Sequence, residues 1–124
     1  MSVRHDFGDT LRAAWAGIPA LSRVDVVVSE KPLGDIRKPT ALIRGRSIGP
    51  EPGAPLSHRR VVCLLTLVSP SGDLDKARDE LDELTWAVLD YLDPTFVHDD
   101  AEAVGYGSRL LAVDIPVTVI AQKD

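Results

Sequence analysis

The apolar residues of two segments recur at spacings of three and four, which places them on one face of a helix. The first segment covers residues 7–18, and Gly17 and Pro19 end it. The second covers residues 74–92, where acidic residues fill the face opposite to the apolar one. Asp73 precedes it at the position of an N-cap carboxylate. The pattern therefore predicts two amphipathic helices.

Four other segments have the composition of β-strands: residues 23–29, 40–48, 59–69 and 109–121. The third is almost continuously apolar, which is typical of a strand covered on both faces, so we expect it at the centre of the sheet. Pro116 lies inside the last segment and predicts an edge position or a bulge there, because proline has no amide hydrogen to donate. Residues 104–108 form a strand or a turn.

A segment rich in proline and glycine separates the second and third predicted strands. Residues 49–55, the Pro/Gly arm, hold three prolines and two glycines, a composition that excludes regular helix or central strand and predicts an exposed, extended loop. The fold class that follows is α+β, over one domain at residues 1–124. We expect one antiparallel-rich mixed β-sheet, two α-helices packed on it and a long Pro/Gly-rich β-hairpin arm.

Composition excludes several classes of protein. With 44% hydrophobic and 27% charged residues, the chain is neither disordered nor a membrane protein. The longest apolar run, residues 61–65, is far too short to span a membrane, and no secretory signal is visible. We therefore expect no membrane partner and synthesis in the cytoplasm.

The net charge of −5 is unevenly distributed along the chain. Residues 1–60 hold ten Lys and Arg against six Asp and Glu, whereas residues 61–124 hold four against thirteen. This asymmetry suits subunits that meet head to tail, with a basic surface against an acidic one. An excess of acid makes free nucleic acid a poor partner.

The chain lacks the usual signs of catalysis. Gly105 and Gly107 do not complete a dinucleotide motif, and no phosphate-binding loop occurs. Cys63 lies in the most apolar predicted strand, so we expect it to be buried and not a nucleophile. His98, Asp99, Asp100 and Glu102 are the one compact group of potential metal ligands, but we expect them to be solvated. We predict no enzyme activity, no cofactor and no metal.

Charged residues on either side of the arm and on the second helix are the candidates for a subunit interface. Arg44, Arg46, Arg59 and Arg60 flank the arm and gather near its base if the two strands pair as a hairpin. No aromatic residue is interleaved with them, which favours protein contact over nucleic acid; ordinary exposed arginines are the alternative. On the acidic helix the candidates are Asp79, Glu80 and Glu83.

The order of elements allows a comparison with a known family. An amphipathic N-terminal helix ending near Pro19 is followed by a strand, the arm, the apolar strand, the acidic helix and a C-terminal strand. Over nearly the whole chain, this layout resembles the tail terminator or tail completion proteins of long-tailed (siphovirus-type) bacteriophages, especially those infecting actinobacteria. The similarity is one of layout, since such proteins share no catalytic motif.

The resemblance implies a structural virion protein at the head-proximal end of the tail, made in the cytoplasm of the host bacterium. As a homo-oligomer, a hexameric ring, it would cap the tail tube, end tail polymerisation and join the tail to the head connector. Its partners would be the tail tube protein and connector proteins, with DNA passing through the ring without specific binding. The alternatives are another head-tail connector or tail-associated subunit, and a small-molecule-binding or enzymatic α/β domain that uses the His98 loop.

Overall fold

The computed structural model describes residues 3–50, 58–107 and 109–122, and of residues 121 and 122 the backbone only. Two helices and six strands follow one another along the chain. Their bounds are α1 Val3–Trp15, β1 Asp25–Val28, β2 Thr40–Pro50, β3 His58–Val68, α2 Leu74–Leu92, β4 Val97–His98, β5 Glu102–Tyr106 and β6 Leu110–Gln122.

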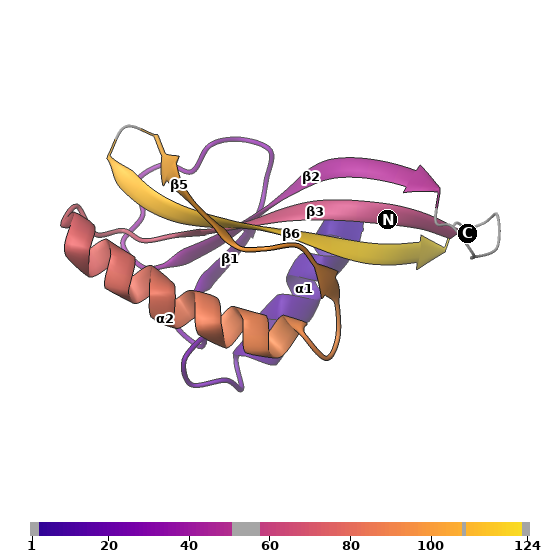
Figure 1. The fold of residues 1–124 in the computed structure, drawn as a ribbon, viewed down its shortest axis with the longest axis horizontal. Helices are drawn as coiled ribbons and strands as arrows, with labels where there is room; N and C mark the ends of the chain where they lie inside the picture. Colours follow the sequence, from indigo (N-terminus) through magenta and orange to yellow (C-terminus); the bar gives the residue numbers. More distant parts are fainter. Residues whose placement is uncertain (1–2, 51–57, 108, 123–124) are drawn as a thin grey trace.

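Both helices lie on the same face of the sheet, which we call the helical face (Figure 1). Helix α1 packs under β1 and β2, and α2 packs under β3 and β6. The helices also meet each other through Trp15 and Tyr91, whose rings pack edge to face at 6.3 Å, and Phe7 of α1 packs in the same way at 5.2 Å on Phe96, which follows α2. Gly8 allows the close approach of α1, because a Cβ there would meet the Val28 side chain at 2.5 Å.

The sheet has the order β1-β2-β3-β6-β4, and β5 also pairs with β6. Strands β1 and β2 are parallel, whereas all the other pairs are antiparallel. The predicted α+β class with an antiparallel-rich mixed sheet is therefore confirmed, as is the interior position of β3. Strands β2 and β3 pair up to Pro50 opposite Arg59. The tip of the predicted arm, residues 51–57, lies outside the described residues.

The apolar core forms between the sheet and the two helices. Its largest fully buried side chains on the helices are Leu11, Trp15, Leu81 and Leu92. They meet the side chains that β2, β3 and β6 direct to the helical face: Ala41, Ile43, Cys63, Leu65, Leu67, Ile115 and Val117. The predicted burial of Cys63 is confirmed.

The opposite face of the sheet, the second face, is covered at one end by the β1–β2 connection (Figure 1). The backbone N–H of Leu33 in this connection donates to the Tyr106 hydroxyl of β5 at 2.6 Å. Leu42, Thr66 and Val68 are buried beneath this cover. Residues 65–68 of β3 are thus buried on both faces, as the continuous apolar run predicts, whereas Leu64 is half-buried.

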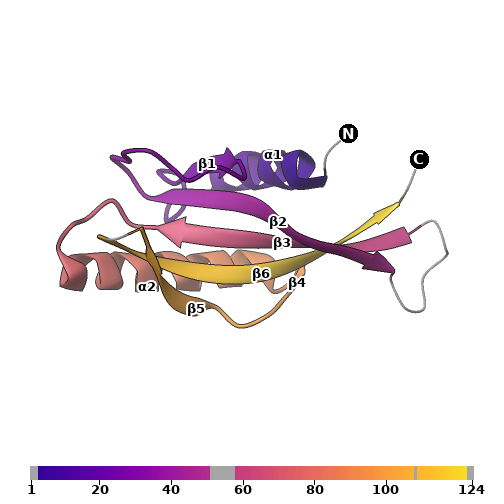
Figure 2. The same cartoon turned by 90° about the horizontal axis from the view of Figure 1, so that it is seen from above.

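The other half of the same strands extends past both helices (Figure 2). It comprises residues 46–50 of β2, 58–62 of β3 and 118–122 of β6, and we call it the distal half of the sheet. A β-bulge marks its start: Gly45 pairs with Cys63 and Ser47 with Val62, so Arg46 is the extra residue. Among the described residues, the start of α1, at Val3 and Arg4, is the part of a helix that reaches the distal half.

Pro116 is tolerated for a reason that the sequence does not reveal. Strand β6 is interior, and its register with β3 runs without a shift from Gln122 to Ala112, so the predicted edge position is wrong. On the other side of β6 the register shifts by one residue between His98↔Val117 and Glu102↔Asp114, which agrees with the predicted bulge. The Pro116 carbonyl accepts from the Asp99 N–H at 3.0 Å. The nitrogen and the carbonyl of one strand residue point to the same side, so the Pro116 nitrogen also faces residues 99–101, between β4 and β5. The N–H that proline lacks is therefore missing on that side, and β3 loses no hydrogen bond.

The Pro/Gly arm begins later than predicted. Gly49 and Pro50 are the last residues of β2 and pair with Arg60 and Arg59 of β3. Proline is acceptable here because β1 pairs only with residues 40–43 of β2, so the amide of Pro50 has no second neighbouring strand. The predicted loop at residues 49–55 is therefore wrong for these two positions, which form strand, while the exclusion of a central strand agrees with their place at the edge.

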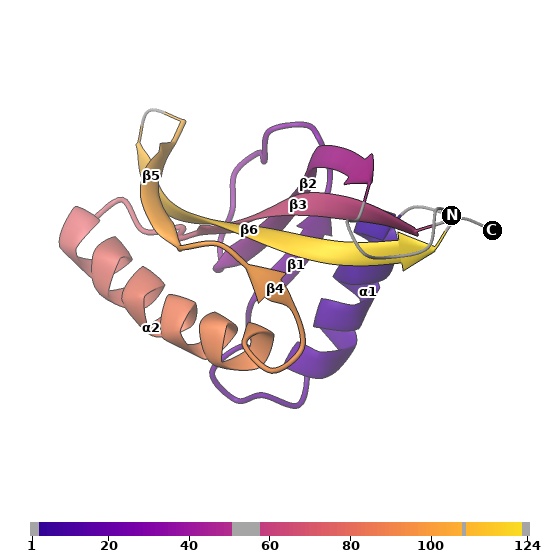
Figure 3. The ribbon, with the colours of Figure 1, turned by 45° about the vertical axis from the view of Figure 1, so that its right-hand side comes forward.

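Helix α2 has the predicted bounds, and the Asp73 carboxylate accepts from the N–H groups of Asp75 and Lys76 at 3.1 and 3.2 Å. Helix α1 ends at Trp15, three residues before the predicted end, and β1 is shorter than predicted. Strand β4 was not predicted, and residues 102–106 form a strand. Figure 3 shows β4 and β5 following one another along β6.

Candidate subunit interface

The side of α2 that faces away from the sheet carries a row of exposed residues. A helix brings residues three and four apart onto one line, so Asp79, Glu83, Trp86 and Asp90 form a single stripe. All four are exposed, and the stripe contains no basic residue. We call it the outer stripe of α2. It combines three carboxylates with one large aromatic ring.

Trp86 and Asp90 are the two residues of this stripe that the sequence analysis missed, and Trp86 is the larger omission. Its side chain is 70% exposed, whereas the other tryptophan, Trp15, is 1% exposed. The signal is present in the sequence, because position 86 lies on the acidic side of the helix and not with Leu81, Leu84 and Val88. Exposed tryptophans are enriched among the residues that dominate binding at protein interfaces.

Glu80 has a different environment from its predicted companions Asp79 and Glu83. It is half-buried, and its Oε1 accepts from the hydroxyl of Ser69 at 2.8 Å, at the end of β3. This hydrogen bond holds the start of α2 against the sheet. All three acids line a groove of about 500 Å³ between α2 and the α1–β1 connection, which contributes Arg23.

The four predicted arginines do not all gather at the base of the hairpin. Arg44 lies earlier in β2, farther from the base of the hairpin, and its Nη2 donates to the hydroxyl of Thr66 at 3.1 Å. That hydroxyl donates to Oδ1 of Asp114 at 2.7 Å. Thr66 is buried, so Arg44 belongs to a polar row that links β2, β3 and β6 on the second face.

Arg46, Arg59 and Arg60 lie in the distal half of the sheet, and all three are exposed. Arg59 and Arg60 are neighbours along β3, so their side chains point to opposite faces. Arg59 shares the helical face with Val61, and Arg60 lies on the second face. Arg46 occupies the bulge. The structure thus divides the predicted basic cluster between two faces.

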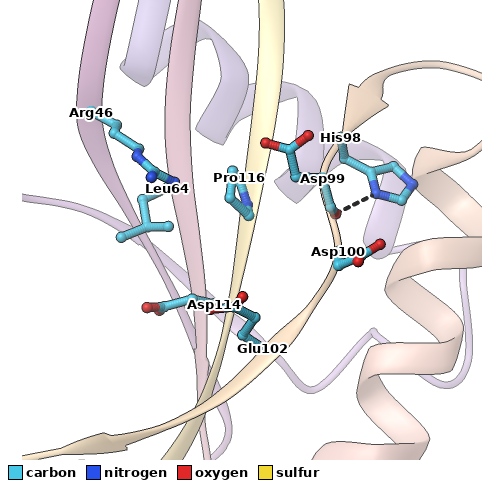
Figure 4. A pocket seen from close by; sticks show the side chains of 8 residues that line it. All are labelled: Arg46, Leu64, His98, Asp99, Asp100, Glu102, Asp114 and Pro116. Carbon is cyan, nitrogen blue, oxygen red and sulfur yellow. Dashed lines mark hydrogen bonds between the residues drawn. The ribbon is translucent and has the colours of Figure 1, made fainter.

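Arg46 lines a pocket of about 650 Å³ on the second face together with several acidic residues (Figure 4). Leu64 and Pro116 form its apolar floor. The carboxylates that line it are those of Asp99, Asp100, Glu102 and Asp114. Among the described residues, no ion pair joins Arg46 to them. The pocket brings one guanidinium together with four carboxylates.

His98 lines the same pocket but is already bonded at both ring nitrogens. Nδ1 lies 2.9 Å from the carbonyl oxygen of Asp99, and Nε2 lies 2.6 Å from Oδ1 of Asp93. Both partners are acceptors, and together they raise the pKa of His98, the Asp99 carbonyl contributing most. An imidazole that donates from both nitrogens has no lone pair for a metal. Within the described residues, no group of three or more His, Cys, Asp or Glu is arranged to hold a metal ion.

Cys63, considered as a nucleophile, lies inside the core. Burial raises the pKa of its thiol, so the reactive thiolate is disfavoured.

A second groove lies on the helical face where the distal half of the sheet meets the start of α1. It has a volume of about 480 Å³, and we call it the α1–hairpin groove. Val3, Ile48 and Val61 give it an apolar lining, and Arg4 and Arg46 also line it. Glu30 fixes one wall, because its carboxylate pairs with Arg4 and accepts from the Gly45 N–H at 3.0 Å. Both bonds lower the pKa of Glu30, the backbone one most.

Comparison with known proteins adds no family to this description, because neither a protein-family model nor a protein of curated function matches the chain. Among the described residues, neither helix has the length and apolar content needed to cross a bilayer.

Proposed function

We propose that the chain is the subunit of a homo-oligomeric ring, a hexamer, that caps the tail tube of a long-tailed phage. The ring ends tail polymerisation and offers a surface to the head-tail connector, and it does so without catalysis or a cofactor. One observation carries this proposal: two exposed, apolar-centred surfaces of opposite charge lie on different parts of the same chain. They are the outer stripe of α2 and the α1–hairpin groove.

Such a pair of surfaces suits head-to-tail assembly. When one patch meets a different patch on the next copy, the contact is heterologous, and the assembly closes into a ring if the rotation between subunits permits. The outer stripe carries Asp79, Glu83 and Asp90, and Arg4 and Arg46 border the groove. Opposite charges across an interface speed encounter and suppress wrong pairings. This arrangement supports a ring more than it supports a monomer.

The layout of the elements supports the phage assignment. Two helices on one face of a mixed sheet, with β2 and β3 continuing as a hairpin beyond them, match the order that the resemblance rests on. The excess of acidic residues, a net charge of −5, suits a ring that DNA passes through without being held, because phosphate groups are repelled by carboxylates.

The proposal is tested by measuring mass in solution by light scattering across a concentration series, followed by electron microscopy of the particles. We expect rings with a central channel, which sit at one end of purified phage tail tubes. A protein that assembles but binds purified connectors and not tubes would instead be another head-tail subunit. A protein that stays monomeric both alone and with tubes would contradict the proposal.

Adjacent arginines of β3 provide a matched pair of variants. Arg59 lies on the face of the groove and Arg60 on the opposite face. Arg59→Glu places a negative charge where the acidic stripe would dock, so the concentration needed for assembly should rise roughly tenfold or more. Arg60→Glu makes the same chemical change one residue away and should have a much smaller effect. Equal effects of the two variants would show that the helical face is not the contact.

A further inference from the structure

Trp86 is the largest exposed aromatic side chain among the described residues, and nothing in the fold accounts for its exposure. It is 70% exposed, and it stands between Glu83 and Asp90 on the outer stripe. A structural role in the core or at a helix end would bury the indole ring. Neither helix α1 nor the sheet reaches this side of α2 (Figure 2). An exposed indole in an acidic setting fits a partner surface that is apolar at its centre and basic at its rim.

The α1–hairpin groove has that character. Its lining includes Ile48, which is 74% exposed, and Val61, which forms the buried floor. Arg4 and Arg46 border it, and Arg59 lies on the same face two residues along from Val61. At about 480 Å³, the groove is in the size range of cavities that take a compact, mainly apolar group.

We propose that the α1–hairpin groove of one copy receives the Trp86 side chain of a second copy. This rests on the head-to-tail assembly proposed above and names its central contact. The indole packs on Val3, Ile48 and Val61, beside the guanidinium group of Arg4, which the Glu30 carboxylate holds in place. Contact between an arginine and the face of a tryptophan adds a cation–π attraction.

Charge complementarity is the reason for choosing a second copy as the occupant. The outer stripe presents three carboxylates around Trp86, and Arg4, Arg46 and Arg59 stand in or beside the groove, where Glu30 offsets the charge of Arg4 and leaves the surface basic. Docking the stripe along the groove brings the two sets together around one buried ring. A desolvated aromatic anchor within a charged rim is the usual anatomy of an interface hot spot.

Tryptophan fluorescence tests this contact directly, because the chain has two tryptophans and Trp15 is already buried. Emission and light scattering are recorded on the same samples across a concentration series. We expect the emission maximum to move to shorter wavelength as the mass rises, since assembly would bury Trp86. Assembly with no change in emission would overturn the proposed contact and leave the ring itself standing.

Variants sharpen the test from both sides of the contact. Trp86→Ala and Ile48→Asp should each raise the concentration needed for assembly by roughly thirtyfold or more, the scale of a hot-spot loss. Leu74→Ala is the matched control: it removes another exposed apolar side chain of α2, outside the stripe, and should leave assembly unchanged. Circular dichroism spectra of the monomers check that each variant is folded.

Each remaining outcome has a defined meaning. If Trp86→Ala assembles as well as the unchanged chain, the proposed contact is wrong. If the unchanged chain is monomeric at every concentration, the contact and the free ring are both overturned. If the protein assembles with a buried Trp86 but never binds tail tubes, the contact holds and the phage function fails.

Discussion

The two halves of strands β2, β3 and β6 are continuous in hydrogen bonding but opposite in burial. In the half next to α2, residues 40–43, 65–68 and 112–113 are buried on both faces, by the helices on one side and by the β1–β2 connection on the other. In the distal half, Ile48 and Ile120 are exposed, and arginines replace aliphatic residues. One half belongs to the core, and the other presents exposed side chains.

The change between the halves occurs over a few residues of β2. At the bulge, Arg46 is inserted opposite an unbroken run of β3, and the strand then continues with Ser47 and Gly49. A bulge increases the local twist, which turns the distal half away from the plane that the helices cover. Two regions of one sheet thus acquire different roles without a domain boundary, and substitutions should separate those roles.

The largest expected effect comes from truncating the buried half. Leu65 is fully buried between the helices and the sheet, so Leu65→Ala should lower the free energy of unfolding by about 2–5 kcal/mol. Ile48→Ala removes a similar side chain from the distal half, where most of it is exposed, and should change stability by about 0.5 kcal/mol or less. Urea unfolding of the monomers measures both. Similar losses of unfolding free energy for the two variants would contradict the difference in burial between the two halves of the sheet.

An intermediate effect is expected where the polar row crosses the sheet. Thr66→Val removes the hydroxyl that joins Arg44 to Asp114 and should cost about 1–3 kcal/mol, because buried polar groups lose a partner. Thr118→Val makes the same change on β6 in the distal half and should be close to neutral. Thermal unfolding compares them, and a neutral Thr66→Val would mean that the row does not stabilise the fold.

The smallest effect concerns the tie between β4 and the end of α2. The pKa of His98 is raised in the folded protein, so the stability it contributes is fully present below its unfolded pKa of about 6.5. That contribution is lost as pH rises through the folded pKa. His98→Gln should therefore destabilise the protein by up to about 1 kcal/mol at pH 5.5 and by less at pH 8.5.

The control for this prediction is His5→Gln, which removes an exposed histidine from α1 and leaves the Asp93–His98–Asp99 contacts intact. Melting temperatures at the two pH values are compared for both variants. An effect of His98→Gln that is equal at pH 5.5 and pH 8.5 would show that the ring's charge does not matter there.

Elements that depend on nearby residues could be predicted from the sequence, and elements that depend on pairing with a distant strand could not. Helix α2 was predicted to the residue, because its apolar period and the Asp73 cap are both local signals. Strand β4 is two residues long and exists through its pairing with β6, so no pattern of its own marks it.

The candidate interface was predicted only in part, for the same reason. The acidic side of α2 follows from helical periodicity, and the same periodicity places Trp86 there. The bulge at Arg46 and the bond from Arg44 to Thr66 depend on the register between β2 and β3, which local pattern does not fix. Arginines that are close in sequence were consequently separated between two faces and two roles.

In the proposed assembly, two different surfaces of one chain meet head to tail, and we test this contact by mixing two defective variants. The first carries Ile48→Asp and Arg59→Glu in the distal half, and the second carries Glu83→Lys and Trp86→Ala on α2. Each variant alone should be monomeric, because each lacks one of the two surfaces.

In a mixture, each variant still has the surface that the other lacks. We expect one molecule of the first variant to bind one molecule of the second through a single contact. Light scattering should then show a species of twice the 13.4 kDa chain mass and nothing larger. A mixture that stays monomeric, or single variants that assemble like the unchanged chain, would contradict head-to-tail contact between α2 and the distal half of the sheet.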